Sequence, residues 1–447
     1  MRLYHPAAHD TDLFPATWWR QTIPALPISR PLAGEADVEV AVVGGGFTGL
    51  SAAYHLARDH GVRAAVLDAG EPGWGASGRN GGFCCMGSAK LGYRAMARRF
   101  GLDAARAFFD SQVQSVDLVA TLIDEHGLDV DRWGRGEFTL AHRPSRFAEL
   151  AEEQRLHREL FGHRLDLLPA QAMTELGLHT AGTFGGLFNA KAFGLNPLKY
   201  LLGLHRLCHE RGLALHYRTP VLKIETRRRR LLLRTRKGTL RADRLLLATN
   251  GYGRDGLHRS IAGRTLPVLS NILVTRPLSE AERAAQGWTA STPAYDSRHL
   301  LHYFRALPDG RFLFGGRGGT SAHPAAVSRL RERLTSTFRQ MFPAWREVEI
   351  THFWNGLACL AFDLHPHLGV DPRDPRIAHA LAYHGNGVAM GTWLGRAAAA
   401  LLADRPDFYG SLPPFLRRPL PPYPLPFLRK AYLGAAYRFM EWRDGSD

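Results

Sequence analysis

The segment 44–49, with the letters GGGFTG, stands between a strand pattern and a helix pattern and constrains the fold more than any other feature. Residues 38–43 form a valine-rich apolar run, typical of a buried parallel strand. Residues 50–57 combine apolar and small side chains, as a helix packed closely on a sheet requires, and Gly61 is placed to end that helix. Residues 63–67 have the pattern of a second strand. This order predicts a parallel βαβ unit, and therefore an α/β fold of the Rossmann type.

Each glycine of this turn has a physical role in binding a dinucleotide. Gly44 permits the tight turn, Gly46 lets a pyrophosphate approach the backbone, and Gly49 lets the helix pack close to the strand. The helix N-terminus offers free N–H groups and a positive dipole end to the phosphates. Asp68 follows Gly49 by 19 residues, where an acid is expected to accept hydrogen bonds from a ribose. A carboxylate there disfavours a 2′-phosphate, so NADP is a poor candidate, but the unit alone does not separate NAD from FAD.

Length and composition set the outer limits. A chain of 447 residues favours two domains, and 45% hydrophobic with 22% charged residues is ordinary for a globular protein with a large core. The sequence contains no run of about 18 apolar residues, so no transmembrane helix is predicted. The first twelve residues lack the apolar stretch of a secretion signal. The four cysteines form neither a disulfide framework nor a CxxC metal motif, so no metal site is predicted. We expect a reduced, cytoplasmic protein.

The formal charge of +16 comes from basic residues spread over the whole chain. Their densest run, Arg227–Arg230, lies between two strand patterns and predicts a solvated hairpin tip. Aromatic side chains do not interleave with this run, which argues against a specific nucleic-acid site. Non-specific attraction to polyanions is the expected by-product.

Further elements follow from the periodicity. Helices are expected at 101–127, 144–160, 197–211 and 324–341, and strands at 213–225, 231–236, 244–249, 300–304 and 311–314, the last two within a region, 264–350, that looks antiparallel. Residues 385–387, GNG, open a small-residue helix at 388–403 that suits the polar end of a cofactor. A basic tail helix is expected at about 427–442 after a proline-rich stretch. It either docks on the body, which we favour, or lies on an anionic membrane as a peripheral contact.

A second glycine-rich segment, GASGRNGG at 75–82, follows the predicted ribose acid. With the 44–68 unit, the strand end ATNGY at 248–252 and the helix start at 385–387, it occurs in an order that resembles the D-amino-acid-oxidase-like flavoprotein superfamily. Within it, the chain is most similar to the gamma-glutamylputrescine oxidoreductase branch, which carries the GASGRNGG segment. Further matching features are Trp18-Trp19 with Pro24, and the segments 303–305, 313–316, 354–356 and 366–369.

The resemblance implies FAD as the cofactor and a two-domain α/β fold. One domain is an FAD-binding Rossmann-type unit of the glutathione-reductase-like kind, and the other is an α+β substrate domain with a large antiparallel sheet. The division implied is 37–100, 195–262 and 352–405 for FAD; 101–194 and 263–351 for substrate; 1–36 as an N-terminal arm; and 406–447 as a proline-rich segment with the basic helix. The implied reaction oxidises an amine C–N bond by hydride transfer to flavin N5.

The resemblance also assigns residues to the cofactor. They are Gly44, Gly46, Phe47, Thr48, Gly49, Asp68, Ala76, Ser77, Arg79, Asn80, Gly81, Gly82, Val221, Thr249, Gly251, Gly356, Gly385, Gly387 and Val388. Some relatives attach the flavin through a cysteine near the position of Cys359. A buried, unreactive side chain is favoured here, so a non-covalent flavin is predicted, with Cys359 as the less favoured covalent site.

Two departures from relatives resembling sarcosine oxidase narrow the expectation. Those relatives place a lysine over the flavin to speed reaction with oxygen, and Leu313 stands roughly there. They hold the substrate carboxylate with a lysine after the pyrimidine-edge glycines, where this chain has Ala389. The electron acceptor is therefore open between oxygen and another molecule, and a larger amine is favoured over a simple N-methyl α-amino acid.

The catalytic residues are not fixed by these patterns. Candidates for the pocket are Tyr303, His302 and His384, and Tyr303 and Arg305 are candidates for binding substrate. His302 and Tyr303 are neighbours on one strand, so at most one of them faces the flavin. Arg305 would hold a substrate carboxylate, or equally an acid on the surface. Amine oxidation needs the neutral amine, and burial can lower the amine pKa without a dedicated base.

The function expected is an FAD-dependent oxidoreductase acting on a small or medium secondary amine, with a γ-glutamylated polyamine as one substrate. An amino-acid dehydrogenase that passes electrons to a membrane quinone is the second hypothesis, motivated by the basic tail helix. A flavin-binding protein without turnover is the third.

Overall fold

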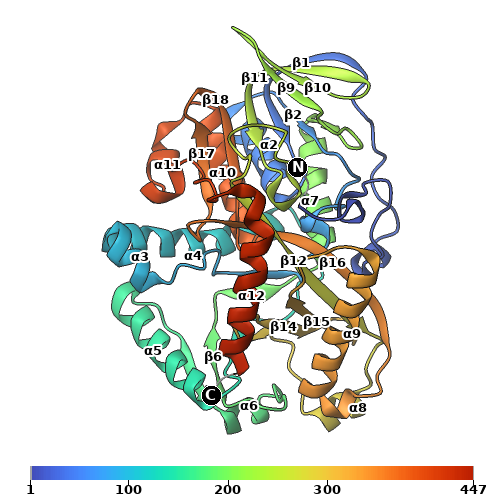
Figure 1. Cartoon of the computed structure of the whole chain (residues 1–447), viewed down its shortest axis with the longest axis vertical. Helices are drawn as coiled ribbons and strands as arrows, with labels where there is room; N and C mark the ends of the chain where they lie inside the picture. Colours follow the sequence, from blue (N-terminus) through green and yellow to red (C-terminus); the bar gives the residue numbers. More distant parts are fainter. Residues whose placement is uncertain (1–2, 446–447) are drawn as a thin grey trace.

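The computed structural model describes residues 3–445, so the outermost residues of the expected arm and tail, 1–2 and 446–447, lie outside the described part. Two eight-stranded sheets and a two-stranded one form the framework. In Figure 1 the first large sheet occupies the upper half of the molecule and the second the lower half, and helix α12 (Arg429–Gly445) runs lengthwise from the middle of the view down over the lower half.

The first sheet contains the predicted βαβ unit. Its order is β17-β18-β11-β1-β2-β8, and β1, β2, β8, β11 and β18 are mutually parallel where they pair. The strands of this path are β1 (Gly34–Val43), β2 (Ala64–Leu67), β8 (Ala214–His216), β11 (Gly238–Leu247), β17 (His367–Asp371) and β18 (Asp374–Leu381). Two further strands, β10 (Leu231–Arg234) paired with β11 and β9 (Lys223–Thr226) paired with β10, complete the eight. Helix α2 (Phe47–His60) connects β1 to β2 and ends at Gly61 in the left-handed conformation, with φ of 64°, as predicted.

Apolar helices cover one face of this sheet. Helix α2 packs between α7 (Pro197–Glu210) and α10 (Ala389–Leu402), and α4 (Leu102–Glu125) lies against α10. Their buried side chains form one continuous core with those of β1 and β18. Small residues of α10, including Gly395, let it approach α2 closely, because a Cβ there would lie 2.5 Å from the Thr48 carbonyl oxygen.

The expected strand at 213–225 is two separate strands. Strand β8 pairs with β2, whereas β9 (Lys223–Thr226) forms an antiparallel hairpin with β10 (Leu231–Arg234). Arg218 has φ of 51° and Pro220 has no N–H to donate, so the chain turns away from the sheet between them. The arginine run is the tip of this hairpin, with the Arg227 N–H donating to the Arg230 carbonyl at 2.9 Å, as predicted.

The second sheet has the order β16-β12-β15-β14-β13-β4-β6-β5. Its strands are β4 (Glu137–Leu140), β5 (Asp166–Pro169), β6 (Gly185–Asn189), β12 (Thr265–Thr275), β13 (Ala294–Asp296), β14 (His302–Ala306), β15 (Phe312–Arg317) and β16 (Ile350–Ala361). All pairs are antiparallel except β13 with β4. The mainly antiparallel character expected of 264–350 is thus confirmed, with one parallel pair that sequence patterns did not indicate.

Register sorts the second sheet into an aromatic face and a polar face. Phe138, Phe304 and Phe314 point to one side and form a core with α9 (Pro324–Met341). Because side chains alternate along a strand, Tyr295 and Tyr303 point to the other side, toward the first sheet.

The remaining elements join or cover the sheets. They are α1 (Trp18–Gln21), β3 (Phe83–Cys85), α3 (Tyr93–Phe100), α5 (Pro144–Phe161), α6 (Ala170–Glu175), β7 (Ala192–Gly194), α8 (Glu280–Gln286), α11 (Pro406–Gly410) and α12 (Arg429–Gly445). Strand pairing joins β16 to the second sheet, whereas the expected division put residues from 352 onward with the FAD part. The division as a whole stays a prediction.

The tail helix α12 is docked on the body, the arrangement that the sequence favoured. Arg429 is buried and forms an ion pair with Asp255, and Leu433 packs on the second sheet with Leu266 and Val268. Phe439 is left 56% exposed, so docking uses one side of the helix only. Across residues 3–445, no helix has the length and apolar character needed to cross a membrane.

Candidate cofactor and substrate site

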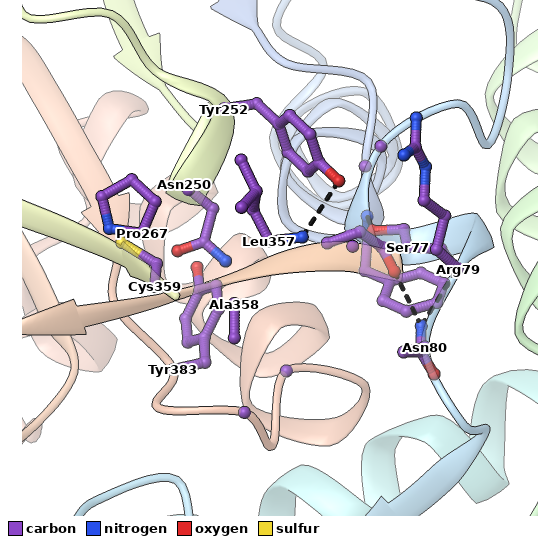
Figure 2. A pocket seen from close by; sticks show the side chains of 18 of the residues that line it. Ser77, Arg79, Asn80, Asn250, Tyr252, Pro267, Leu357, Ala358, Cys359 and Tyr383 are labelled. Atoms are coloured by element: carbon purple, nitrogen blue, oxygen red, sulfur yellow. Dashed lines mark hydrogen bonds between the residues drawn. The ribbon is translucent and has the colours of Figure 1, made fainter. Parts of the chain in front are cut away.

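A cavity of about 530 Å³ lies where the two sheets meet. The turn after β1, the 75–82 loop and the start of α10 form one part of its wall, and strands β12, β14, β15 and β16 form another. Figure 2 shows Tyr252, Leu357 and Ser77 at this wall, with the Leu357 N–H donating to the Tyr252 hydroxyl at 3.1 Å. Segments more than 300 residues apart thus meet around one space.

The turn after β1 presents backbone to the cavity. Gly46 caps helix α2 without a side chain, so the N–H groups of its first turn, apart from that of Phe47, lack a capping side chain and can meet a ligand. The Ser77 hydroxyl of the neighbouring loop accepts the Phe47 N–H at 3.0 Å and fixes the two loops together. Gly49 lies beneath the turn, because a Cβ on it would lie 1.8 Å from the Gly44 carbonyl oxygen.

Asp68 ends β2 beside this turn. One carboxylate oxygen accepts the Gly45 N–H at 2.7 Å, and the other accepts the Gly70 N–H at 2.9 Å. Burial raises the pKa of Asp68 despite these bonds. The carboxylate lines the cavity, so it is placed to receive a ribose hydroxyl, which remains a prediction.

The 75–82 loop is held rigidly by its own side chains and by tryptophans. Asn80 accepts the Gly82 N–H at 2.9 Å and donates to the Ala76 and Ser77 carbonyls, both at 3.1 Å. Arg79 lies over the Trp74 ring, 4.4 Å from its centroid. Two indole N–H groups, from Trp19 and Trp354, donate to the carbonyls of Asn80 and Arg79 at 2.9 and 2.7 Å. The N-terminal arm therefore serves to fix this loop.

A second helix start completes the wall. Gly385 has φ of 104°, which favours glycine, and Val388 caps α10 without a side-chain hydrogen bond. The Tyr383 hydroxyl lies 2.8 Å from the Thr48 hydroxyl, which links the starts of α10 and α2. Two helix N-termini therefore approach the same cavity.

Most of the residues predicted for the cofactor line this cavity. They are Gly44, Gly46, Phe47, Thr48, Asp68, Ala76, Ser77, Arg79, Asn80, Gly81, Val221, Thr249, Gly251, Gly356, Gly385, Gly387 and Val388. Gly49 and Gly82 lie behind the lining, because close backbone contacts leave no room for a side chain. The Thr249 hydroxyl is buried at the cavity and lacks a hydrogen-bond partner within residues 3–445, as expected of a group that meets a ligand.

The comparison with family models decides what these features belong to. The model for FAD dependent oxidoreductases, named DAO, matches residues 39–401. The chain belongs to this family. It is an FAD-dependent oxidoreductase, and the open helix starts, the ribose-side acid and the orphaned hydroxyl fit that cofactor.

Curated relatives and solved structures agree with the assignment. The chain is 31% identical to a probable oxidoreductase OrdL of Haemophilus influenzae over 84% of this chain and 85% of that protein. It is 30% identical to the gamma-glutamylputrescine oxidoreductase of Escherichia coli over 91% of this chain and 93% of that protein. The fold matches glycine oxidase from Geobacillus kaustophilus with a TM-score of 0.66 and 20% identity, covering 83% and 95% of the two chains. The resemblance drawn from the glycine segments is confirmed.

Cys359 lines the cavity on β16 but is a poor thiolate. Its side chain is buried, and burial raises its pKa to about 12. Figure 2 shows it beside Pro267, which is its partner in the β12–β16 pairing. A thiol with so high a pKa reacts slowly as a nucleophile.

We therefore expect Cys359→Ser to leave the flavin content of the purified protein unchanged. Acid precipitation of the unaltered protein should release all the yellow colour into the supernatant, because no covalent bond holds the flavin. Colour that stays in the pellet, and is lost from it in Cys359→Ser, would show covalent attachment.

Of the four pocket candidates, the structure brings only Tyr303 to the cavity. Its hydroxyl is 2.8 Å from that of Ser270, and its ring lies directly against Gly81 and Gly315. His302 points to the opposite face, where its Nδ1 is 2.9 Å from Asp296 and its ring stacks on Phe314. This agrees with the alternation expected of neighbours on a strand.

Arg305 and His384 lie behind the wall. The Arg305 guanidinium is buried and donates to the carbonyls of Gly81 and Leu195 at 3.0 and 2.6 Å. No carboxylate in the described part of the chain forms an ion pair with it, because the strand turns this side chain against the backbone of the 75–82 loop. His384 is buried, and burial lowers its pKa to about 3, so its ring is neutral at physiological pH.

Several polar residues of the cavity were missed from the sequence. Lys90, Glu137, Ser270, Tyr295 and Arg317 all line it. The alternation that placed Tyr303 could have found Arg317, which follows Gly315 by two residues on the paired strand β15. No local pattern marks Lys90 or Glu137, since each reaches the cavity only through the packing of distant elements.

Proposed function

We propose that the protein oxidises the C–N bond of a small or medium amine that carries a carboxylate, and that a γ-glutamylated polyamine is a substrate of this class. The observation that supports the proposal is a pair of cations, Lys90 and Arg317, in the cavity that also contains the cofactor-binding loops. The bound FAD would supply the acceptor for the hydride that leaves the carbon beside nitrogen.

Arg317 is suited to hold the carboxylate. Its guanidinium donates to the His384 carbonyl at 3.0 Å and lies against Gly385, next to the helix start predicted for the flavin. Within residues 3–445 the groups whose electrostatic interaction raises its pKa are the phenols of Tyr437 and Tyr303, and no carboxylate is among them. Burial disfavours the charged form of Arg317 and lowers its pKa. An anionic ligand beside the guanidinium would stabilise the charged form by a charge-assisted hydrogen bond.

Lys90 adds a second positive group. Its side chain is solvent exposed toward the cavity, and the charge of nearby Arg317, followed by the surrounding protein, lowers its pKa to about 7. Two adjacent cations raise the local potential and lower the pKa of any amine between them and the flavin loop. The substrate amine is thereby favoured in its neutral, oxidisable form without a dedicated base.

Tyr303 forms the wall between these cations and the 75–82 loop. Burial raises its pKa to about 12, so the phenol stays protonated and its bond with Ser270 keeps the ring in place. The ring contacts Gly81, which the family resemblance places at the flavin. We assign Tyr303 the work of positioning substrate and excluding water.

Anaerobic titration of the yellow protein with an amine panel tests the proposal. Carboxylate-bearing amines should bleach the flavin, and admission of oxygen or of a soluble quinone then shows which acceptor restores the colour. Rapid recovery with quinone alone would favour the amino-acid dehydrogenase hypothesis. Failure of every amine to bleach the flavin would favour a flavin-binding protein without turnover.

Arg317→Met should raise the KM of carboxylate-bearing amines ~10- to 100-fold, since one charge-assisted hydrogen bond contributes about 1.5–3 kcal/mol. Amines without a carboxylate should change by less than about threefold. Arg331→Met, on the exposed side of α9, is the matched control and should behave as the unaltered protein. If KM rises equally for amines with and without a carboxylate, Arg317 does not bind the substrate carboxylate, and that part of the proposal is wrong.

A further inference from the structure

A buried carboxylate without a cationic partner lies on the polar face of the second sheet. Glu137 is 5% exposed, lines the cavity, and has one carboxylate oxygen without a hydrogen-bond partner in the described part of the chain. An unpaired buried carboxylate is costly, so such a group calls for a ligand or a function.

Strand register fixes the direction of this side chain. Thr139 pairs with Tyr295, Tyr295 with Tyr303, and Tyr303 with Gly315, so these residues form one row on the cavity face. Glu137 precedes Thr139 by two residues and therefore points to the same face. It reaches the substrate side of the sheet, while neighbouring Phe138 points into the aromatic core.

A second carboxylate lines the part of the cavity beside Glu137. Glu153 of α5 lines it, with a side chain that is 51% exposed, and marks the way to the surface. Its partner His157, 3.9 Å away, has a pKa lowered to about 4 by burial and is neutral at pH 7. Neither acid thus has a charged partner, and their mutual repulsion adds to burial in raising the pKa of Glu137 to about 8.

The surroundings suit an organic cation. Tyr93 and Tyr295 line this part of the cavity and offer ring faces and phenol oxygens, which favour an ammonium group. A hydrated metal ion would need several oxygen ligands in a close polyhedron, which two carboxylates among aromatic rings do not supply. The Cys85 thiol, whose pKa burial raises well above its ordinary value, is neutral and offers no competing charge.

Glu137 and Arg317 lie on strands that are not neighbours in the second sheet. Glu137 is on β4 and Arg317 on β15, with β13 and β14 between them. Three strand spacings separate the two strands by about 14 Å. An elongated molecule with an anionic group at one end and a cationic group toward the other fits this arrangement.

We propose that Glu137, with Glu153 at the entrance, binds an ammonium group of the substrate other than the amine that is oxidised, and that it thereby selects elongated amines with a second positive charge. The inference rests on the proposed function in so far as the ligand is the substrate. Glu137 acts as a specificity residue, and the oxidation itself needs only the groups beside the flavin loop.

Glu137→Gln tests the assignment with a matched pair of probes, 1,4-diaminobutane and 1-aminopentane, which differ in a terminal ammonium or methyl group. Dissociation constants are read from the change in the visible flavin spectrum, which needs no turnover. The unaltered protein should bind the diamine at least tenfold more tightly, and Glu137→Gln should reduce the ratio to below threefold by weakening the diamine alone. Glu159→Gln, on the exposed side of α5, is the control and should keep the ratio.

The pH dependence gives a second readout. A cation binds the ionised Glu137, so diamine affinity should rise as pH increases from about 6.5 toward 8.5, through the raised pKa of this acid. The titratable groups that line the cavity with Glu137 include Cys85, Tyr93, Glu153, His157 and Tyr295, and Cys85 interacts with both Glu137 and Lys90. Lys90, with a pKa of about 7, titrates in the same range and persists in Glu137→Gln, so the part of the slope that the variant loses belongs to Glu137.

The two proposals fail separately. A diamine preference that is unchanged in Glu137→Gln, or no diamine binding to the unaltered protein, overturns the assignment of Glu137 whatever the amine panel shows. If the preference for the diamine depends on Glu137 but no amine bleaches the flavin, the cation site is supported and the proposed amine oxidation is wrong.

Discussion

Gly49→Ala is expected to yield a protein that retains less than a tenth of its flavin. The added Cβ would lie 1.8 Å from the Gly44 carbonyl oxygen and 3.1 Å from a methyl group of Val42. Both neighbours belong to the turn and strand that shape the pyrophosphate site, so relief of the clash must displace the backbone that the cofactor contacts. Flavin content, from the ratio of visible to protein absorbance after gel filtration, measures the effect.

Gly434→Ala is the matched control for this substitution. Gly434 lies in α12, and a Cβ there meets nothing within 4 Å. Full flavin content is expected, with a gain in stability of up to about 1 kcal/mol, because alanine favours a helix over glycine. Stoichiometric flavin in Gly49→Ala would show that the turn tolerates a side chain and that the backbone approach inferred from the glycine spacing is wrong.

Arg305→Met should lower the stability of the protein by about 3 kcal/mol and weaken flavin retention, because it leaves two buried carbonyls without donors. Those carbonyls belong to Gly81, in the flavin loop, and to Leu195. Thermal unfolding with and without added FAD measures the loss. Addition of FAD should recover part of it by mass action.

The same variant separates the two hypotheses for Arg305. If it held a substrate carboxylate, Arg305→Met would raise KM for carboxylate-bearing amines and leave the melting temperature unchanged. The structure predicts the reverse: an unchanged KM for the fraction that retains flavin, and a lower melting temperature. Arg331→Met again serves as the exposed control.

Local patterns predicted a set of cofactor residues, most of which line the cavity, while their contacts with FAD stay a prediction. The glycine spacing at 44–49, the acid at 68 and the helix start at 385–387 each describe a backbone shape that a few adjacent residues determine. Such shapes depend on φ angles and on the absence of a Cβ, which the sequence states directly. The family match then confirmed the FAD assignment over residues 39–401.

Patterns were much weaker for the substrate half. Arg305 has the chemistry of a carboxylate ligand, yet the strand turns it against the flavin loop, while Arg317 on the next strand reaches the cavity. Alternation separates His302 from Tyr303 but does not tell which face meets the cofactor. Lys90 follows β3, far in sequence from Arg317, and the two are neighbours only because the 75–82 loop and β15 border one cavity.

The sequence by itself determined that this chain binds a dinucleotide, and through its glycine segments which family it belongs to, because backbone turns are encoded within a few residues. Only the tertiary structure decided which charged side chains line the cavity. Strand register and the packing of one sheet against the other bring Lys90 near Arg317 and place Glu137 on another strand beside the same cavity. A side chain's neighbours across a cavity depend on contacts between distant segments, which no local spacing encodes.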